Sequence, residues 1–175
     1  MSQLPSTYTL ISSNVLASSA ASVTFSAIPS TYTDLVVRMS VRGDQASAIS
    51  DFTLRLNSDS ASNYSETRLL GYNGSNVLSD RLSSQTSIQN ITVNGSTSTA
   101  STFSNGEIYL PTYTSTTSKP ISVFDVVENN SATSNQVLAD AALYRNSTAI
   151  SSLTFTANGN FVSGSSFYLY GIKNS

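Results

Sequence analysis

The stretch Leu35–Val41, which reads LVVRMSV, decides the fold class of this 175-residue chain. Its odd-numbered residues are all apolar, whereas Arg38 and Ser40 between them are polar. A period of two is the pattern of a strand that buries one face and exposes the other. The stretch therefore predicts a β-strand in a sheet that covers a core.

The same alternation returns along the whole chain, in runs rich in β-branched and aromatic residues. Turn signals such as Asn73-Gly74 and Asn158-Gly159 separate these runs. We expect strands at Tyr8–Val15, Val23–Ala27, Tyr32–Val41, Phe52–Asn57, Ser65–Leu70, Ile88–Val93, Glu107–Leu110, Ile121–Glu128, Ala139–Arg145, Ile150–Ala157 and Ser166–Lys173. About ten short strands without a convincing helix predict an all-β fold, an antiparallel β-sandwich, and we favour its jelly-roll form.

One segment fits two structures. The apolar residues of Asn135–Tyr144 also fit a helical face, which Asn135 would cap, but we assign the segment to a strand. For the domain organisation, we expect residues 1–22 to form an N-terminal arm with the first strand. Residues 23–175 are then a single β-sandwich domain.

The composition excludes several classes of function. The chain contains no cysteine and no histidine, which removes disulfides, thiolate or imidazole metal sites and histidine-based catalysis. Its net charge is −2 and it has no basic stripe, so we expect no nucleic-acid partner. The apolar runs are too short to span a membrane, and the N-terminus does not resemble a secretory signal. We expect no cofactor, no metal and synthesis in a cytoplasm.

Hydroxyl and amide groups, not charges, solvate this protein. Charged residues make up only 10% of the chain, whereas serine, threonine and asparagine account for 72 of the 175 residues. An ordinary soluble domain has about 25% charged residues. A surface with so little charge promotes association in free solution, and it suits a protein that is fixed in an assembly.

Two segments are short of core anchors. Ser83–Asn105 carries no charge and consists almost entirely of small polar residues around Ile88, Ile91 and Val93. We interpret the whole segment as a mobile surface loop or hairpin, or as an arm that orders only against a partner, although Ile88–Val93 is among the expected strands. The same two interpretations apply to Met1–Thr7.

Short motifs point to turns more strongly than to chemistry. The integrin-type tripeptide Arg42–Asp44 stands where a strand must end. Asn57–Asp59 resembles the start of a calcium loop but lacks the glycine and glutamate of an EF-hand. We weighed four carboxylates as catalytic groups, and no spacing marks out a pair: Glu66, Glu107, Asp125 and Glu128. We therefore expect no catalytic residue and no enzyme.

Some strands appear apolar on both faces. Tyr168 and Tyr170 alternate with the core residues of the last strand, and they fit a second core face, a subunit contact or a sugar-stacking platform. We expect part of this second face to form an interface between subunits. Its candidate residues are Val36, Phe124, Val126, Tyr168 and Tyr170.

Three segments resemble small virion structural proteins of tailed bacteriophages, of the type frequent in marine and cyanobacterial phages. They are Ile28–Arg38, Leu54–Ser65 and Ala149–Lys173, within matching regions of roughly residues 23–75 and 139–173. The middle of the chain, residues 83–135, carries no resemblance. The matching motifs enter strands and form turns, so the resemblance brings no catalytic residue with it.

The resemblance and the composition together predict a capsid decoration (cement) protein, located on the surface of the virion and assembled in the host cytoplasm. Its partners would be the major capsid protein and itself, as a homotrimer that fits the threefold sites of a capsid. The alternative is a tail-fibre or receptor-binding module that recognises host surface glycans. That alternative requires a shallow groove lined by exposed aromatic side chains and a few amides.

Overall fold

The computed structural model describes residues 7–130 and 134–173, and it confirms an all-β sandwich of antiparallel strands. It has twelve strands, rather than about ten, and no helix among the described residues, hence none that could cross a membrane. The strands are β1 (Tyr8–Val15), β2 (Ala20–Phe25), β3 (Asp34–Val41), β4 (Ile49–Leu56), β5 (Tyr64–Tyr72), β6 (Asn76–Gln85), β7 (Ile88–Asn94), β8 (Ser104–Leu110), β9 (Lys119–Val127), β10 (Gln136–Tyr144), β11 (Leu153–Phe161) and β12 (Ser166–Ile172).

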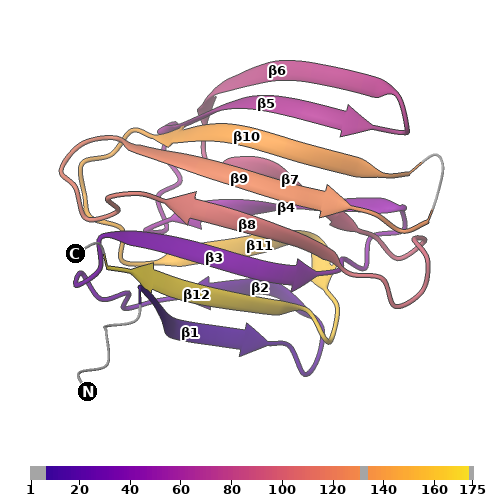
Figure 1. Cartoon of the computed structure of the whole chain (residues 1–175), viewed down its shortest axis with the longest axis horizontal. Helices are drawn as coiled ribbons and strands as arrows, with labels where there is room; N and C mark the ends of the chain where they lie inside the picture. The colour runs from indigo at the N-terminus through magenta and orange to yellow at the C-terminus, as the bar shows by residue number, and fades with distance from the viewer. Residues whose placement is uncertain (1–6, 131–133, 174–175) are drawn as a thin grey trace.

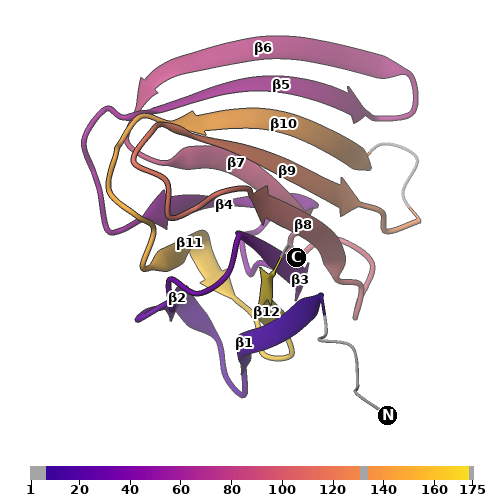
Figure 2. The same ribbon diagram turned by 60° about the vertical axis from the view of Figure 1, so that its left-hand side comes forward.

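Two sheets of unequal width face each other (Figure 1). The larger sheet has eight strands in the order β1-β12-β3-β8-β9-β10-β5-β6, and the smaller sheet has four in the order β2-β11-β4-β7. Strands β5 and β6 lie at one end of the larger sheet, where they extend beyond β7, the edge of the smaller sheet (Figure 2). Strand β1, which we expected in a separate N-terminal segment, pairs with β12 along its length.

The core fills the space between the sheets with the side chains that the alternation predicted. The odd-numbered residues of β3 all belong to it. Four phenylalanines form its centre, with ring centroids 5.1–6.1 Å apart, in edge-on or tilted pairs: Phe52, Phe155, Phe161 and Phe167. Strands from both sheets contribute to this cluster, so neither sheet has a hydrophobic core without the other.

Segment 135–144 forms strand β10, not a helix, because its alternate residues Leu138, Ala142 and Tyr144 face the core. The strand that the pattern did not predict is β6, whose apolar residues do not alternate regularly. It is an edge strand that pairs only with β5, and most of its side chains are exposed. An edge strand needs no regular apolar face, so it leaves little signal in the sequence.

The expectation of a mobile loop or arm at Ser83–Asn105 is wrong. Its short predicted strand is β7 of the smaller sheet, and Ile88, Ile91 and Val93 are buried in the core. A β-bulge explains why they did not look like one face. Ile88 pairs with Leu54 and Ile91 with Phe52, and the extra residue is accommodated where Asn90 adopts a φ of 54°. Of the other expected arm, Met1–Thr7, all but Thr7 lies outside the described residues.

One buried side chain holds the rest of this segment. The guanidinium of Arg42 donates hydrogen bonds of 2.8–3.2 Å to the carbonyl oxygens of Ser96, Ser98, Thr99 and Thr102. Because Arg42 is buried and its donors are occupied, the Arg42–Asp44 tripeptide cannot present its arginine to a receptor. The loop that follows β7 is thus held by hydrogen bonds from the Arg42 guanidinium to its carbonyl oxygens.

We predict that Arg42→Met destabilises the fold by about 2–4 kcal/mol, because it removes the buried guanidinium that joins the carbonyl oxygens of Ser96, Ser98, Thr99 and Thr102. The matched control is Arg38→Met, which removes an exposed ion pair with Glu107 and should cost about 0–1 kcal/mol. Urea unfolding of the two variants measures the difference. Equal midpoints would show that the loop does not depend on Arg42.

Candidate functional site

The larger sheet has eight strands, and the side chains that alternate with its core residues point away from the core. They form the broad outer face of this sheet. Along β9 the inward residues are Ile121, Val123, Asp125 and Val127, so Phe124 and Val126 point outward. The paired strands continue this alternation, because residues opposite each other in an antiparallel sheet lie on the same face. The outward residues therefore form rows that can be followed strand by strand.

Two neighbouring rows of this face are apolar. In the first, Ala139 of β10 stands between Phe124 and Leu69. In the second, Val126, Val137, Gly71 and Val77 follow one another from β9 to β6. Four of these side chains are among the large hydrophobic residues that remain exposed: Phe124 at 49%, Val137 at 42%, Leu69 at 55% and Val77 at 73%. We call Leu69, Val77, Phe124, Val126, Val137 and Ala139 the apolar patch.

No charged side chain belongs to the apolar patch. The row of Phe124 and Ala139 continues away from the patch, on β8 and β3, as Glu107 and Arg38, which form an exposed ion pair of 2.8 Å. On β6 the outward residue Arg81 donates to the hydroxyl of Thr67. A contiguous apolar surface rimmed by polar groups is typical of an interaction site.

The five residues predicted for a subunit interface all lie on this outer face, but in two groups. Phe124 and Val126 belong to the apolar patch, whereas Tyr168 and Tyr170 lie on β12. Three strand spacings, roughly 14 Å, and the Arg38–Glu107 pair separate Tyr168 from Phe124. The alternation alone could not show this division, because it does not say which strands are neighbours.

The second group is built around tyrosines. Tyr170 pairs with Leu10 on one side and Val36 on the other, and its ring meets that of Tyr8 edge-on at 6.4 Å. Val36 itself is only 2% exposed, because it stands in the row between Tyr170 and Tyr109. It therefore offers little surface to a partner. We call the group Tyr8, Leu10, Tyr109, Tyr168 and Tyr170 the tyrosine surface.

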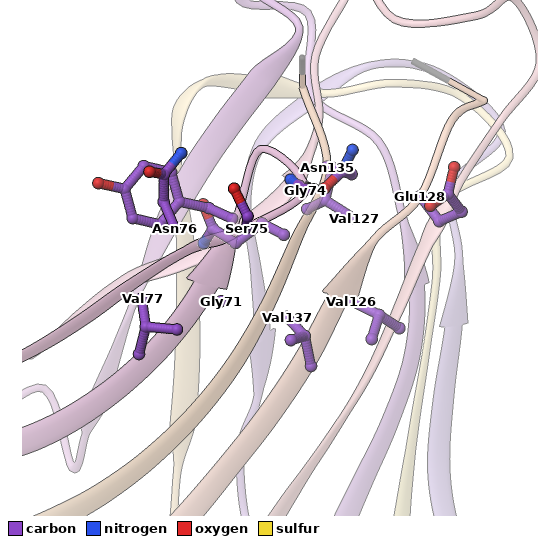
Figure 3. Close-up of a pocket in the computed structure, with 12 residues that line it drawn as sticks. Gly71, Gly74, Ser75, Asn76, Val77, Val126, Val127, Glu128, Asn135 and Val137 are labelled. Atoms are coloured by element: carbon purple, nitrogen blue, oxygen red, sulfur yellow. Dashed lines mark hydrogen bonds between the residues drawn. The ribbon is translucent and has the colours of Figure 1, made fainter. Parts of the chain in front are cut away.

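A shallow hollow of about 500 Å³ lies where the apolar patch reaches the β5–β6 turn. Figure 3 shows Val77, Val137 and Val126 side by side on neighbouring strands, with Gly71 between Val77 and Val137. Gly71 has no side chain to fill this row, and a Cβ there would come within 3.3 Å of Val137. Polar groups line the other end of the hollow: Tyr72, Ser75, Asn76, Glu128, Asn135 and Gln136.

The carboxylates weighed for catalysis do not form one site. Glu128 is exposed and Glu107 is half-buried, whereas Glu66 and Asp125 are buried beneath the larger sheet. Both buried carboxylates accept hydrogen bonds from backbone amides of β7: Gln89 donates to Glu66 at 2.9 Å and Thr92 to Asp125 at 3.0 Å. Burial raises the pKa of Asp125 to about 7, against the lowering effect of the bonds from Thr92. Their visible role is to join the edge of the smaller sheet to the larger one.

The candidate calcium loop is also satisfied by the protein itself. One oxygen of Asp59 accepts from the amide of Ala61, and the other from the side chains of Asn63, Tyr144 and Asn146. Burial alone would raise the pKa of Asp59, but these four donors lower it to about 2. Within residues 7–130 and 134–173, no group of three or more acidic side chains is placed to hold a metal ion.

Comparison with known proteins adds no family assignment. No protein-family model matches the chain, and searches of curated proteins and of solved structures found no match either.

We predict that removing divalent metal leaves the stability unchanged, because the oxygens of Asp59 already have protein donors. Thermal unfolding with a chelator and with excess calcium should give the same midpoint. A midpoint that rises with calcium in the wild type, but not in Asp59→Asn, would instead identify residues 57–59 as a metal loop.

Proposed function

We propose that this protein is a structural component of a tailed-phage particle, a capsid decoration protein that binds its neighbours through the outer face of the larger sheet. The observation that carries the proposal is the apolar patch. Its large side chains are exposed on the outer face of the larger sheet, and no charged side chain stands among them, in a protein that has few charges overall. Such a surface is suited to permanent contact inside an assembly.

The strand order supports this proposal. Along the chain, β1, β3, β8 and β12 of the larger sheet alternate with β2, the pair β4 and β7, and β11 of the smaller sheet. We infer that these eight strands are a jelly roll, and that β5, β6, β9 and β10 are additions to one of its sheets. Every residue of the apolar patch lies on the four added strands.

The resemblance to virion proteins falls mainly on the eight alternating strands. Its three segments cover the first part of β3, the end of β4, the start of β5, β11 and β12, and the wider matching regions also include the rest of β5 and part of β10. These elements build the core, whereas most of the apolar patch lies outside them. We therefore propose that this protein shares its core strands with the virion proteins it resembles, whereas the apolar patch is particular to this chain.

The proposed mechanism is mechanical. Contact with neighbouring capsid subunits removes apolar surface from water, which contributes about 25 cal/mol per Å². Bridging two subunits in this way opposes their separation under the pressure of packaged DNA. Because the apolar patch carries no charge, the contact should depend little on ionic strength.

We predict that Leu69→Ser combined with Phe124→Ser weakens binding to particle heads by roughly tenfold per residue, as expected for central interface side chains. The control is Val15→Ser on β1, which is also exposed, at 59%, but outside the apolar patch. The assay adds purified protein to heads that lack it and measures occupancy by co-sedimentation. Full occupancy by the double variant contradicts the assignment of this face.

The tyrosine surface is the proposed contact between copies of this chain in a homotrimer. It lies on the same face as the apolar patch but apart from it, so one molecule can use both. We predict that Tyr168→Ser with Tyr170→Ser dissociates the trimer while each domain stays folded. Analytical ultracentrifugation tests this, and a monomeric wild type at micromolar concentration removes the proposal.

A second candidate function is glycan binding, and the hollow beside Gly71 favours it. The hollow brings the ring of Tyr72 together with amides, as a sugar site requires. The Gln136 amide already donates to Thr92, which leaves Tyr72 and Asn76 as the residues to test. If glycan-array binding is lost in Tyr72→Ala and kept in Tyr109→Ala, the hollow is the sugar site and the protein is a receptor-binding module.

A further inference from the structure

The free edge of β7 is closed by acidic side chains from the larger sheet. β7 pairs with β4 on one side only, and on its other side Glu66 and Asp125 accept its amides. Both carboxylates accomplish this while almost completely buried, at 1% exposure each. Closing an edge in this way prevents further strands from adding to it.

Glu66 has a second acidic neighbour. Asp140 of β10 lies directly opposite Arg68 of β5, so Glu66, two residues earlier on β5, is its diagonal neighbour on the same face. Asp140 is 4% exposed. Among residues 7–130 and 134–173, neither oxygen of Asp140 has a hydrogen-bond donor, and neither does the second oxygen of Glu66. Three carboxylate oxygens are therefore buried together without partners.

The surrounding charges do not compensate two carboxylates. The cationic neighbour is Arg68, whose guanidinium is held by Asp80 of β6 at 2.8 and 2.5 Å. Asp125 of β9 adds a further acidic group. The β7 residues that bond to Glu66 and Asp125, Gln89 and Thr92, are neutral. Two ionised carboxylates here would repel each other in a medium that screens charge poorly.

We propose that Glu66 and Asp140 share one proton. This proton makes the attachment of β7 to strands β5, β6 and β10 of the larger sheet sensitive to alkaline pH. With one proton between them, a protonated Glu66 donates to Asp140 and still accepts the Gln89 amide on its other oxygen. The one buried oxygen of Glu66 that lacked a hydrogen-bond partner then has one. With both groups ionised, that bond is lost and repulsion takes its place.

The titration of the pair has a definite sign. Burial raises the pKa of both Glu66 and Asp140, and the negative charge of Asp140 raises the pKa of Glu66 further, against a lowering effect of Arg68. A carboxyl whose pKa is raised by folding binds its proton more tightly in the folded state. The stability from this pair is therefore greatest in mild acid and falls as the pH rises through neutrality to about 9.

The test compares urea unfolding from pH 5 to pH 9 for the wild type, Glu66→Gln and Asp140→Asn. Each variant supplies a permanent donor where the proton would be. For the wild type we expect the unfolding equilibrium constant to increase about tenfold for each unit by which folding raises a pKa. Both variants should reduce this increase. The control Glu107→Gln changes an exposed carboxyl and should keep the wild-type dependence.

Two further measurements locate the effect. Infrared spectra at pH 7 should show a protonated carboxyl band that weakens in Glu66→Gln. The protection of amides in residues 86–94 from exchange, relative to the intrinsic rate at each pH, should fall at pH 9 in the wild type only. An unfolding constant that does not change with pH, or a pH dependence that both variants retain, overturns the proposal. So does calcium that stabilises the wild type at pH 9, because the pair would then hold a metal ion and not a proton.

Discussion

The hydrogen bonds between the backbone of β7 and the carboxylates of the larger sheet are the constraint on which the two-sheet arrangement depends. An edge strand that is buried must find acceptors for amides that have no neighbouring strand. Here Glu66 and Asp125 supply them, and the hydroxyl of Ser104 accepts the amide of Asn94 at 2.8 Å. The smaller sheet thus ends at β7 without an open edge, and its register against the larger sheet is set by side chains as well as by packing.

This arrangement also explains why the two ends of the larger sheet differ. Strands β1, β12, β3 and β8 lie over an apolar core, whereas β5 and β6 reach past β7 and carry the ion pair of Arg68 and Asp80. Where the sheet extends beyond the core, charged side chains are buried on its inner side and apolar side chains are exposed on its outer side. The buried carboxylates Glu66, Asp125 and Asp140 and the whole apolar patch lie on β5, β6, β9 and β10.

Most strands could be predicted from the sequence, because burial of one face produces a period of two that Leu35–Val41 shows plainly. The strand prediction failed where that cause is absent, because β6 has no buried face. Strand β7 was predicted, but the bulge at Asn90 breaks its period, so its three apolar residues did not reveal that they share one buried face. For the candidate site, Phe124 and Val126 could be recognised as outward, but Leu69, Val77 and Val137 could not be joined to them. Their proximity depends on the strand order, which is set by contacts between distant segments.

The pairing of the chain's two ends has a consequence for biosynthesis. β12 lies between β1 and β3, and β11 lies between β2 and β4, so the first four strands share no ladder with one another. Until residues 153–172 have left the ribosome, these four strands have no partner on the side that β11 and β12 will occupy. Such long-range pairing is slow and leaves strand edges open in the meantime. The complete two-sheet fold can therefore form only after β11 and β12 have been synthesised, although β5, β6, β8, β9 and β10 can pair with one another before then.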